Sequence, residues 1–475
     1  MVSPPPISRM GTAEWGFLEC RGMTQHHSTH GPSETPGNEA TPRGSIAVVG
    51  AGIVGASAAL ALKRAGFDVT LYSERTREDL RDAVPATGTA ILFGDSRSHD
   101  ARIEGDRYGA DAAFATSAVT VNGGPTFDAP YDYEAQSVDV RLRADDRIGL
   151  FLDEGGSFAH RRVDDAELDR ISGENDVTFV ATGKGGLAER FPVDAERSPY
   201  PEPQRYLLTV TVRPADGGDV RFPGRTENER SALLSIDAEE GEVFVGPYLH
   251  KDAGPAWVLL GFARFGSESE KAYREAHDSA SALDIFRAQH HRLFPDVAPQ
   301  IDALEVIDSD EYSWLKGAVT PTVRRPVART DSGGLLVALG DTAIAVDPIA
   351  GQGAQLGAIQ VAALAEALRE EPGEWDEELF TRLFDAHWER HGKPSVEATS
   401  LFLGDAKYAE VVGAFFGRAA ENPAAGSALF DLLSVPGPVL GLRGEEDVER
   451  FVRTFEGHRA AAPAASPQVT ASTHV

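Results

Sequence analysis

The stretch that decides the fold is Ile46-Ala47-Val48-Val49-Gly50-Ala51-Gly52-Ile53-Val54-Gly55. Its first four residues are largely β-branched and predict a short strand, and the Ala- and Leu-rich segment Ala56–Arg64 predicts a helix. The glycines between them have separate uses in a dinucleotide site. Gly50 permits a tight turn, Gly52 lets a pyrophosphate approach the backbone, and Gly55 lets the helix pack closely on the strand. The spacing therefore predicts a dinucleotide-binding turn.

A second strand, Val69–Tyr72, completes a strand-helix-strand unit and predicts a parallel sheet. Glu74 follows this strand, 24 residues after Gly50. A carboxylate at this point accepts hydrogen bonds from ribose hydroxyls. The alternative for the whole motif is a glycine turn that packs for structural reasons only.

Further along, strand-helix alternation encloses a β-rich middle. Val177–Ala181 and Leu335–Leu339 predict two more strands of the parallel sheet, and Gln352–Leu368 predicts a long helix. Between them lie four strand-like runs separated by turn residues, which predict an inserted antiparallel sheet: Tyr206–Val212, Ala232–Ile236, Glu242–Val245 and Trp257–Phe262. After Trp375 the pattern is helical. The predicted fold class is α/β, a GxGxxG (Rossmann-like) domain with an inserted β-rich substrate domain and a helical C-terminal segment.

A second glycine-rich element follows the strand Leu335–Leu339. It consists of Gly340-Asp341, then Asp347-Pro348, then Gly351-Gln352-Gly353-Ala354. The glycines would let a planar ring approach the backbone, and the amides that open the next helix would point at a ligand. Taken alone, this element is more simply a strand-loop-helix connection with glycine caps.

Composition narrows the class of protein. The 475 residues carry 45 Lys and Arg against 74 Asp and Glu, a net charge of −29, which disfavours nucleic acid and anionic membranes as partners. Cys20 is the one cysteine, so no disulfide forms within the chain. His26, His27 and His30 lie in a Pro- and Gly-rich stretch that predicts a disordered tail rather than a metal site. Without a long apolar run or a secretory signal, we expect a cytoplasmic protein.

The pattern G-D-x5-D-P-x-x-G-Q-G resembles the flavin-contact motif of the FAD-dependent aromatic hydroxylase superfamily. Within it, the chain resembles the oxygenase component of styrene and indole monooxygenases, over roughly residues 44 to 450. Four stretches carry this resemblance: Gly50–Gly55, then 122–125 with 137–142, then Ala181-Thr182-Gly183-Lys184 running on to 198–205, and Gly340–Ala354.

The resemblance implies a two-component FAD monooxygenase. Single-component relatives carry an Asp-Gly motif for FAD and NAD(P)H, whereas the corresponding strand end reads Ala181–Gly186. A separate NAD(P)H-flavin reductase would supply reduced FAD, since only a helical segment follows Ala354. The flavin halogenase signature W-x-W-x-I-P is missing. The implied reaction uses O2 to epoxidise an apolar aromatic alkene or an indole-like substrate. A flavin C4a-hydroperoxide would carry the chemistry, so no catalytic residue and no metal is assigned.

The resemblance and the motifs together give a set of cofactor-binding residues: Gly50, Gly52, Ile53, Val54, Gly55, Glu74, Arg75, Arg141, Thr182, Gly183, Asp341, Asp347, Pro348, Gly351, Gln352, Gly353 and Ala354. The family's loop after the second strand carries an Arg and an Asn, but this chain has Val84 and Thr87 there. Thr87 is predicted to contact the substrate or flavin, and Arg81 to replace the arginine. The apolar neighbours Pro85, Ala86 and Ile91 suit a hydrocarbon substrate.

The predicted organisation has four parts: an FAD-binding domain (44–90, 135–185 and 325–370), a substrate-binding domain (91–134 and 186–324), a helical segment (371–459) and tails (1–43 and 460–475). Two alternatives stay open, a single-component NAD(P)H-dependent flavin hydroxylase and a non-catalytic flavin-binding protein. The sequence does not give the natural substrate, the stereochemistry, the reductase, the oligomeric state (a homodimer included) or the true start among Met1, Met10 and Met23.

Overall fold

The structure, a computed structural model, describes residues 44–88, 91–124, 126–218, 231–370 and 375–461. The chain divides into two units, residues 1–41 and 42–475, and every described residue lies in the second. The predicted N-terminal tail, with its histidines and alternative start residues, lies outside the described residues. So does the C-terminal tail from residue 462, although helix α14 continues to Ala461, two residues past the predicted boundary.

The first sheet is the predicted parallel one. Its strands run in the order β14-β15-β6-β1-β2-β5, and all neighbours are parallel except β14 and β15. The strands are β1 (Ser45–Val49), β2 (Asp68–Ser73), β5 (Ser157–His160), β6 (Val177–Val180), β14 (Val327–Arg329) and β15 (Leu335–Ala338). Since parallel strands end at the same edge, the segments after β1, β2, β6 and β15 meet there.

Helices cover both faces of this sheet, which explains why its central strands are apolar throughout. Helices α1 (Ile53–Arg64), α4 (Val140–Asp153) and α9 (Gln352–Glu370) pack in one core cluster with alternate strand residues such as Val48 and Phe179. The intervening strand residues pack in a second cluster with helix α5 (Asp165–Glu174).

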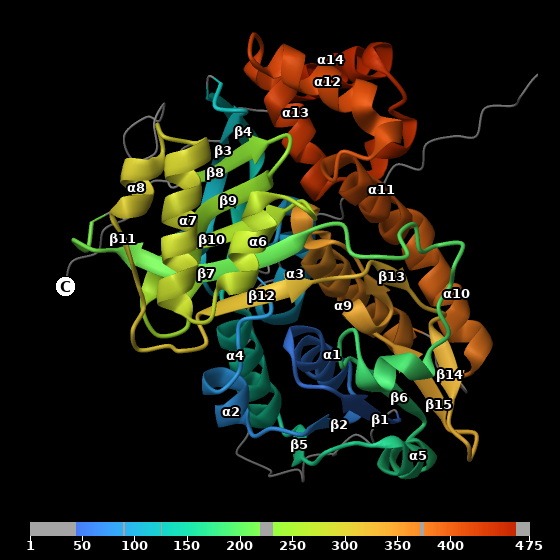
Figure 1. The fold of residues 1–475 in the computed structure, drawn as a ribbon. Helices are drawn as coiled ribbons and strands as arrows, with labels where there is room; N and C mark the ends of the chain where they lie inside the picture. The colour runs from blue at the N-terminus through green and yellow to red at the C-terminus, as the bar shows by residue number, and fades with distance from the viewer. Residues whose placement is uncertain (1–43, 89–90, 125, 219–230, 371–374, 462–475) are drawn as a thin grey trace, which may run out of the picture. The chain divides into compact units, whose positions relative to one another are not determined.

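The second sheet has eight strands, ordered β11-β7-β10-β9-β8-β3-β4, with β12 also paired to β7. They are β3 (Ala113–Val121), β4 (Phe127–Gln136), β7 (Tyr206–Pro214), β8 (Ala232–Asp237), β9 (Gly241–His250), β10 (Gly254–Ala263), β11 (Leu304–Val306) and β12 (Trp314–Ala318). Figure 1 shows α6 (Glu268–Glu275), α7 (Ser279–Leu293) and α8 (Ala298–Asp302) over one face, where they share a core with the sheet.

This sheet corrects one sequence expectation. It is not wholly antiparallel, because β3 pairs parallel with β8, Ser117 opposite Ala232. The chain leaves β4, builds part of the first sheet and returns to β7 and β8, and such a long crossover permits parallel pairing. The β3–β4 hairpin was not predicted, because β4 reads FDAPYDYEAQ and its proline and charges break the alternation of a strand.

The last helices are α10 (Glu377–His387), α11 (Lys393–Phe402), α12 (Ala409–Ala419), α13 (Pro423–Ser434) and α14 (Glu445–Ala461), with a π-helical turn, Trp388–Gly392, between α10 and α11. The remaining elements include α2 (Arg77–Asp82), α3 (Gly94–Glu104) and the small pair β13 (Thr322–Val323) and β16 (Ile344–Ala345). None of the helices in the described ranges is long and apolar enough to cross a membrane.

The predicted fold class is confirmed. Each strand of the first sheet falls within 44–90, 135–185 or 325–370, and the strands of the second sheet fall almost entirely within the ranges assigned to the inserted domain. The domain boundaries themselves stay a prediction.

Candidate functional site

Two glycines of the turn after β1, Gly50 and Gly55, leave no room for a side chain. Gly50 has φ +105°, and a Cβ there would overlap the carbonyl oxygen of Ala181 at the end of β6. A Cβ on Gly55 would overlap the carbonyl oxygen of Gly50. The amide of Gly50 donates to the carbonyl of Tyr72 on β2, at 2.9 Å. These contacts fix the helix against the strand ends, as the motif predicts.

Gly52 differs from the other two glycines, since a Cβ at this position would have no atom within 4 Å. It is exposed and forms the N-cap of α1 without a side-chain hydrogen bond, and the first turn of α1 has no acidic residue. The amides of Ile53 and Val54 thus begin a 12-residue helix beside open space. A free helix N-terminus attracts anions, so this place fits the pyrophosphate of FAD.

Glu74 and Arg75 directly follow β2 at the same edge, and both are exposed. The carbonyl of Glu74 accepts a hydrogen bond from Nε2 of His160 at 3.2 Å, which leaves the backbone anchored while the side chain extends from the strand end. This is the place that the sequence predicts for a ribose contact.

The ends of β6 and β15 are joined by side chains. The hydroxyl of Thr342, in the short helix Gly340–Thr342, donates to the carbonyl of Gly183 at 3.0 Å. Nζ of Lys184 lies 3.0 Å from Oδ2 of Asp341. The structure therefore brings Gly183 close to the Gly340–Thr342 segment, and the role of Thr182, Gly183 and Asp341 in FAD binding stays a prediction. Lys184 was not among the predicted site residues. The signal available in the sequence was its position just after the end of a predicted strand, next to Thr182-Gly183.

The loop from Asp347 to Ala354 surrounds a buried carboxyl. The Asp347 carboxylate accepts a hydrogen bond from the amide of Ile349 at 3.1 Å and caps the short helix Pro348–Ala350. Burial raises the pKa of Asp347 to about 6. Gly351 then turns with φ +61°. Gly353 lies near Asp341, since a Cβ on it would be 3.5 Å from Oδ1 of that residue.

Two glutamines hold this loop in place. Gln352 is buried, and its amide nitrogen donates to the carbonyls of Ala350 and Leu433, each at 3.0 Å. The side chain of Gln352 thus joins the loop to α13 and is not exposed for contact with a ligand. Gln355, which was not predicted, accepts from the amide of Phe93 at 3.0 Å and donates to the carbonyl of Gly351 at 2.9 Å.

Arg141 occupies a different place from the predicted cofactor contact. Its guanidinium is buried between two carboxylates, 2.8 Å from Asp139 and 2.6 Å from Asp310. Nη1 donates to the carbonyl of Val84 at 3.3 Å. Ion pairing satisfies the charge of a buried guanidinium. Arg141 therefore acts on the site by positioning the Val84 loop.

The side chains of the Val84 loop present an apolar surface with one hydroxyl. Val84, Pro85 and Ala86 are half-buried, and Thr87 is exposed. Arg81 pairs with Asp252 at 2.7 Å in the β9–β10 turn, and its replacement of the family's arginine stays a prediction.

An aromatic cluster lies beside the Pro348–Ala350 turn. Ile91, Phe93 and Ala350 belong to one core cluster, and Ile349 and Phe244 of β9 pack against it half-buried. Its rings come from both the second sheet and α13, with contacts such as Tyr131 against Phe430 at 5.7 Å between centroids. Sequence reasoning missed this cluster, because its members come from segments far apart along the chain.

Two family models match the chain. The one described as "Styrene monooxygenase A putative substrate binding domain" matches residues 183–300, and the one described as "NAD(P)-binding Rossmann-like domain" matches residues 48–77. The first match covers β7 to β10 with α6 and α7. The second covers the turn of Gly50 to Gly55 and reaches past Glu74.

The chain also resembles individual proteins. It is 25% identical over 329 residues to styrene monooxygenase StyA of Pseudomonas sp, covering 68% of this chain and 77% of that protein. A flavoprotein/dehydrogenase from Cytophaga hutchinsonii has a TM-score of 0.59 at 13% identity, over 88% of this chain and 99% of that one. The flavin-dependent brominase Bmp2 has a TM-score of 0.57 at 14% identity, over 88% and 99%.

The solved structures support the fold, and the sequence relatives support the activity. Together they confirm the predicted resemblance to styrene monooxygenase oxygenases, the FAD cofactor and the enzyme class, a flavin-dependent monooxygenase. The individual site residues stay predictions, and the geometry around Gly52, Glu74 and Asp341 fits them.

Proposed function

We propose that this styrene monooxygenase-like, FAD-dependent monooxygenase receives reduced FAD from a separate NAD(P)H-flavin reductase and uses O2 to epoxidise an apolar aromatic alkene or an indole-like substrate. The StyA similarity over more than two thirds of that protein supports the substrate class. Because the partner reductase draws on NAD(P)H, we propose that the reaction takes place in the cytoplasm.

The two-component proposal rests on the contacts of the segment that follows β6. In single-component relatives this segment would carry an Asp-Gly element for NAD(P)H. Here Gly183 is bonded to Thr342, Lys184 is paired with Asp341, and the carbonyl of Lys184 accepts from Arg324 at 3.2 Å. The segment therefore contacts the Gly340 loop and Arg324.

FAD would be held by groups from three strand ends. The amides that begin α1 would bind the pyrophosphate, Glu74 a ribose hydroxyl and Asp341 a ribitol hydroxyl, while Gly351 and Gly353 would let the ring approach the backbone. Bound reduced FAD supplies the activation of O2.

The protein's own contribution to the reaction is positioning and exclusion of water. The side chains of Ile349 and Phe244 are half-buried beside the aromatic cluster and would offer apolar contacts to a hydrocarbon. Apolar contacts would also keep water from the reacting oxygen. An alkene that attacks activated oxygen needs no base to deprotonate it, so the proposal assigns no catalytic acid or base.

The test compares two sources of electrons under anaerobic conditions. We expect NADH to leave FAD bound to this chain oxidised, and an unrelated flavin reductase with NADH to bleach it. Absorbance near the flavin maximum in a stopped-flow instrument measures both. Rapid bleaching of the bound FAD by NADH without a reductase would instead establish the single-component hydroxylase.

A further inference from the structure

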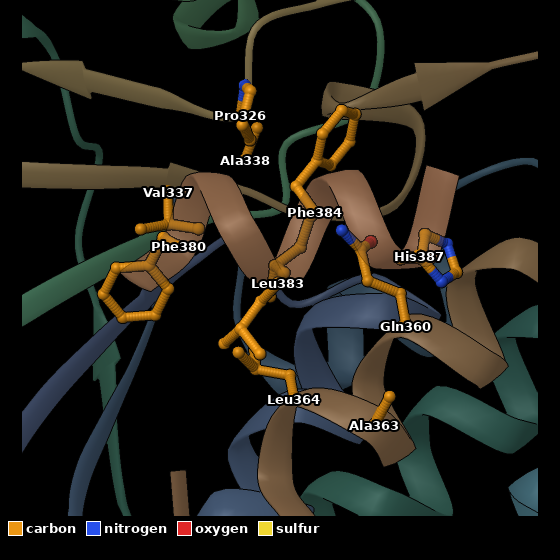
Figure 2. A pocket seen from close by; sticks show the side chains of 11 residues that line it. Pro326, Val337, Ala338, Gln360, Ala363, Leu364, Phe380, Leu383, Phe384 and His387 are labelled. Atoms are coloured by element: carbon orange, nitrogen blue, oxygen red, sulfur yellow. The ribbon is translucent and has the colours of Figure 1, made fainter. Parts of the chain in front are cut away.

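A pocket lies between α9, α10 and β15 (Figure 2). Its volume is about 50 Å³. Nearly all of its lining is apolar, with two polar side chains, and the residues are Pro326, Val337, Ala338, Leu339, Gln360, Ala363, Leu364, Phe380, Leu383, Phe384 and His387. Figure 2 shows Phe380 at one end of the pocket and Gln360 and His387 toward the other.

His387 is the unusual member of this lining. Its side chain is 7% exposed, and neither ring nitrogen has a hydrogen-bond partner among the described residues. Burial lowers the pKa of His387 to about 3, so the ring is neutral and offers one donor and one acceptor. Buried polar groups in native proteins are nearly always satisfied, by protein, water or ligand.

The backbone beside His387 is also irregular. The π-helical turn Trp388–Gly392 begins directly after it. A Cβ on Gly392 would lie 2.7 Å from the Trp388 ring, so the turn depends on a glycine. Single π-helical turns within α-helices occur frequently at functional sites. The fold thus places His387 at the pocket by an uncommon local structure.

We propose that this pocket is a second binding site, for a small neutral alcohol whose hydroxyl bonds to His387 and whose carbon chain lies among the leucine and phenylalanine side chains. No charged side chain lines the pocket, so an ionised ligand would be buried without a partner. A pure hydrocarbon would leave His387 unsatisfied. The volume corresponds to a few water molecules, or to an alcohol of about three carbons.

Binding of the alcohol would also affect the Gly340-Asp341 loop, which the proposed function assigns to FAD. This step rests on that proposed function. Oε1 of Gln360 accepts a hydrogen bond from the amide of Gly340 at 2.8 Å. Leu339, which lines the pocket, directly precedes Gly340. A molecule that orders Gln360 and Leu339 therefore changes the free energy of ordering Gly340-Asp341 for FAD.

The binding test uses flavin-free protein and 1-propanol as the probe. Saturation transfer from protein to 1-propanol in NMR should be strong for the wild type and should be lost in Ala363→Phe, which fills the pocket from an exposed helix position. His387→Phe should weaken it as well. Ala420→Phe, at an exposed alanine that does not line the pocket, is the matched control and should retain it. Equal transfer in the wild type and Ala363→Phe would overturn the site, and so would absence of transfer in the wild type, which would leave water as the occupant.

The coupling test measures FAD affinity by calorimetry with and without 1-propanol. We expect the Kd of FAD to change by about fivefold or more in the wild type and to stay constant in Ala363→Phe. An unchanged Kd in wild type that binds 1-propanol would overturn the coupling. Because the binding test contains no flavin, its failure is distinct from a failure of the proposed monooxygenase.

Discussion

Gly52 is a residue whose proposed role concerns the ligand and not the packing of the fold. The place of its missing side chain is open, whereas Gly50 and Gly55 face backbone atoms. The contrast between Gly52 and the other two glycines therefore separates the needs of the ligand from those of the fold, and a substitution at Gly52 tests ligand binding with little effect on packing.

We expect Gly52→Val to lower FAD affinity by more than about tenfold, or about 1.4 kcal/mol, because the branched side chain would occupy the space of the pyrophosphate. The thermal unfolding temperature should stay close to that of the wild type, since no atom lies within 4 Å of the new Cβ. Calorimetry measures the affinity. Unchanged FAD binding by the folded variant would show that the motif does not hold the cofactor.

Asp347 gives a prediction about pH. Its pKa is raised to about 6 by burial, so between about pH 4 and 6 the folded state binds more protons than the unfolded state. The contribution of this group to stability is greatest at low pH and falls as the pH rises through that window. From about pH 5.5 to 7.5 the loss is on the order of 1 kcal/mol.

The measurement is urea unfolding of wild type and Asp347→Asn at both pH values. We expect the wild type to lose about 1 kcal/mol more than the variant over this range. Asp431, whose pKa burial also raises to about 6, is present in both proteins and cancels in the comparison. A parallel change in the two proteins would mean that Asp347 stays ionised in the fold.

At the scale of elements, the contact of α1 with the strand ends depends on Gly55. We expect Gly55→Ala to reduce the free energy of unfolding by about 3 kcal/mol, because the added methyl group would overlap the backbone of Gly50. Gly413, exposed in the middle of α12 with no atom within 4 Å of its Cβ position, is the control. Gly413→Ala should stabilise by about 0.5–1 kcal/mol through helix propensity. Urea unfolding of both variants measures this, and equal effects would contradict the packing role of Gly55.

Elements with a strong local pattern were predictable. The strand-turn-helix of β1 and α1 carries its period and its glycines within twenty residues, and the strand ends after β6 and β15 follow from parallel pairing. The β3–β4 hairpin was not predictable, because its edge strand β4 is polar and contains a proline. The brace from Gln355 to Phe93 joins residues 262 apart, and no local pattern reports such a contact.

Arg141 shows the same limit within the site. Its neighbour Asp139 was visible in the sequence, but its second partner Asp310 is 169 residues away. The family resemblance implied a cofactor contact for Arg141, whereas in the folded chain its guanidinium is paired with two carboxylates. The position of the Arg141 side chain therefore depends on a long-range ion pair that no local sequence pattern reports.

At the scale of the whole molecule, the proposed site draws on several separate parts of the chain. The parallel sheet gathers the strand ends that would hold FAD, and the second sheet and α13 supply the aromatic cluster beside them. Such an arrangement suits the proposed transfer of oxygen to an apolar molecule, for which we propose that a separate reductase supplies the reduced FAD.

The most direct test of this account is the origin of the oxygen in the product. The chain, FAD, NADH and an unrelated flavin reductase are incubated with styrene under oxygen-18 gas, and the product is examined by mass spectrometry. The account predicts styrene oxide that carries one atom of oxygen-18, with no product when the reductase is left out. Absence of the epoxide with active reductase present, or epoxide that forms equally well without the reductase, would contradict it.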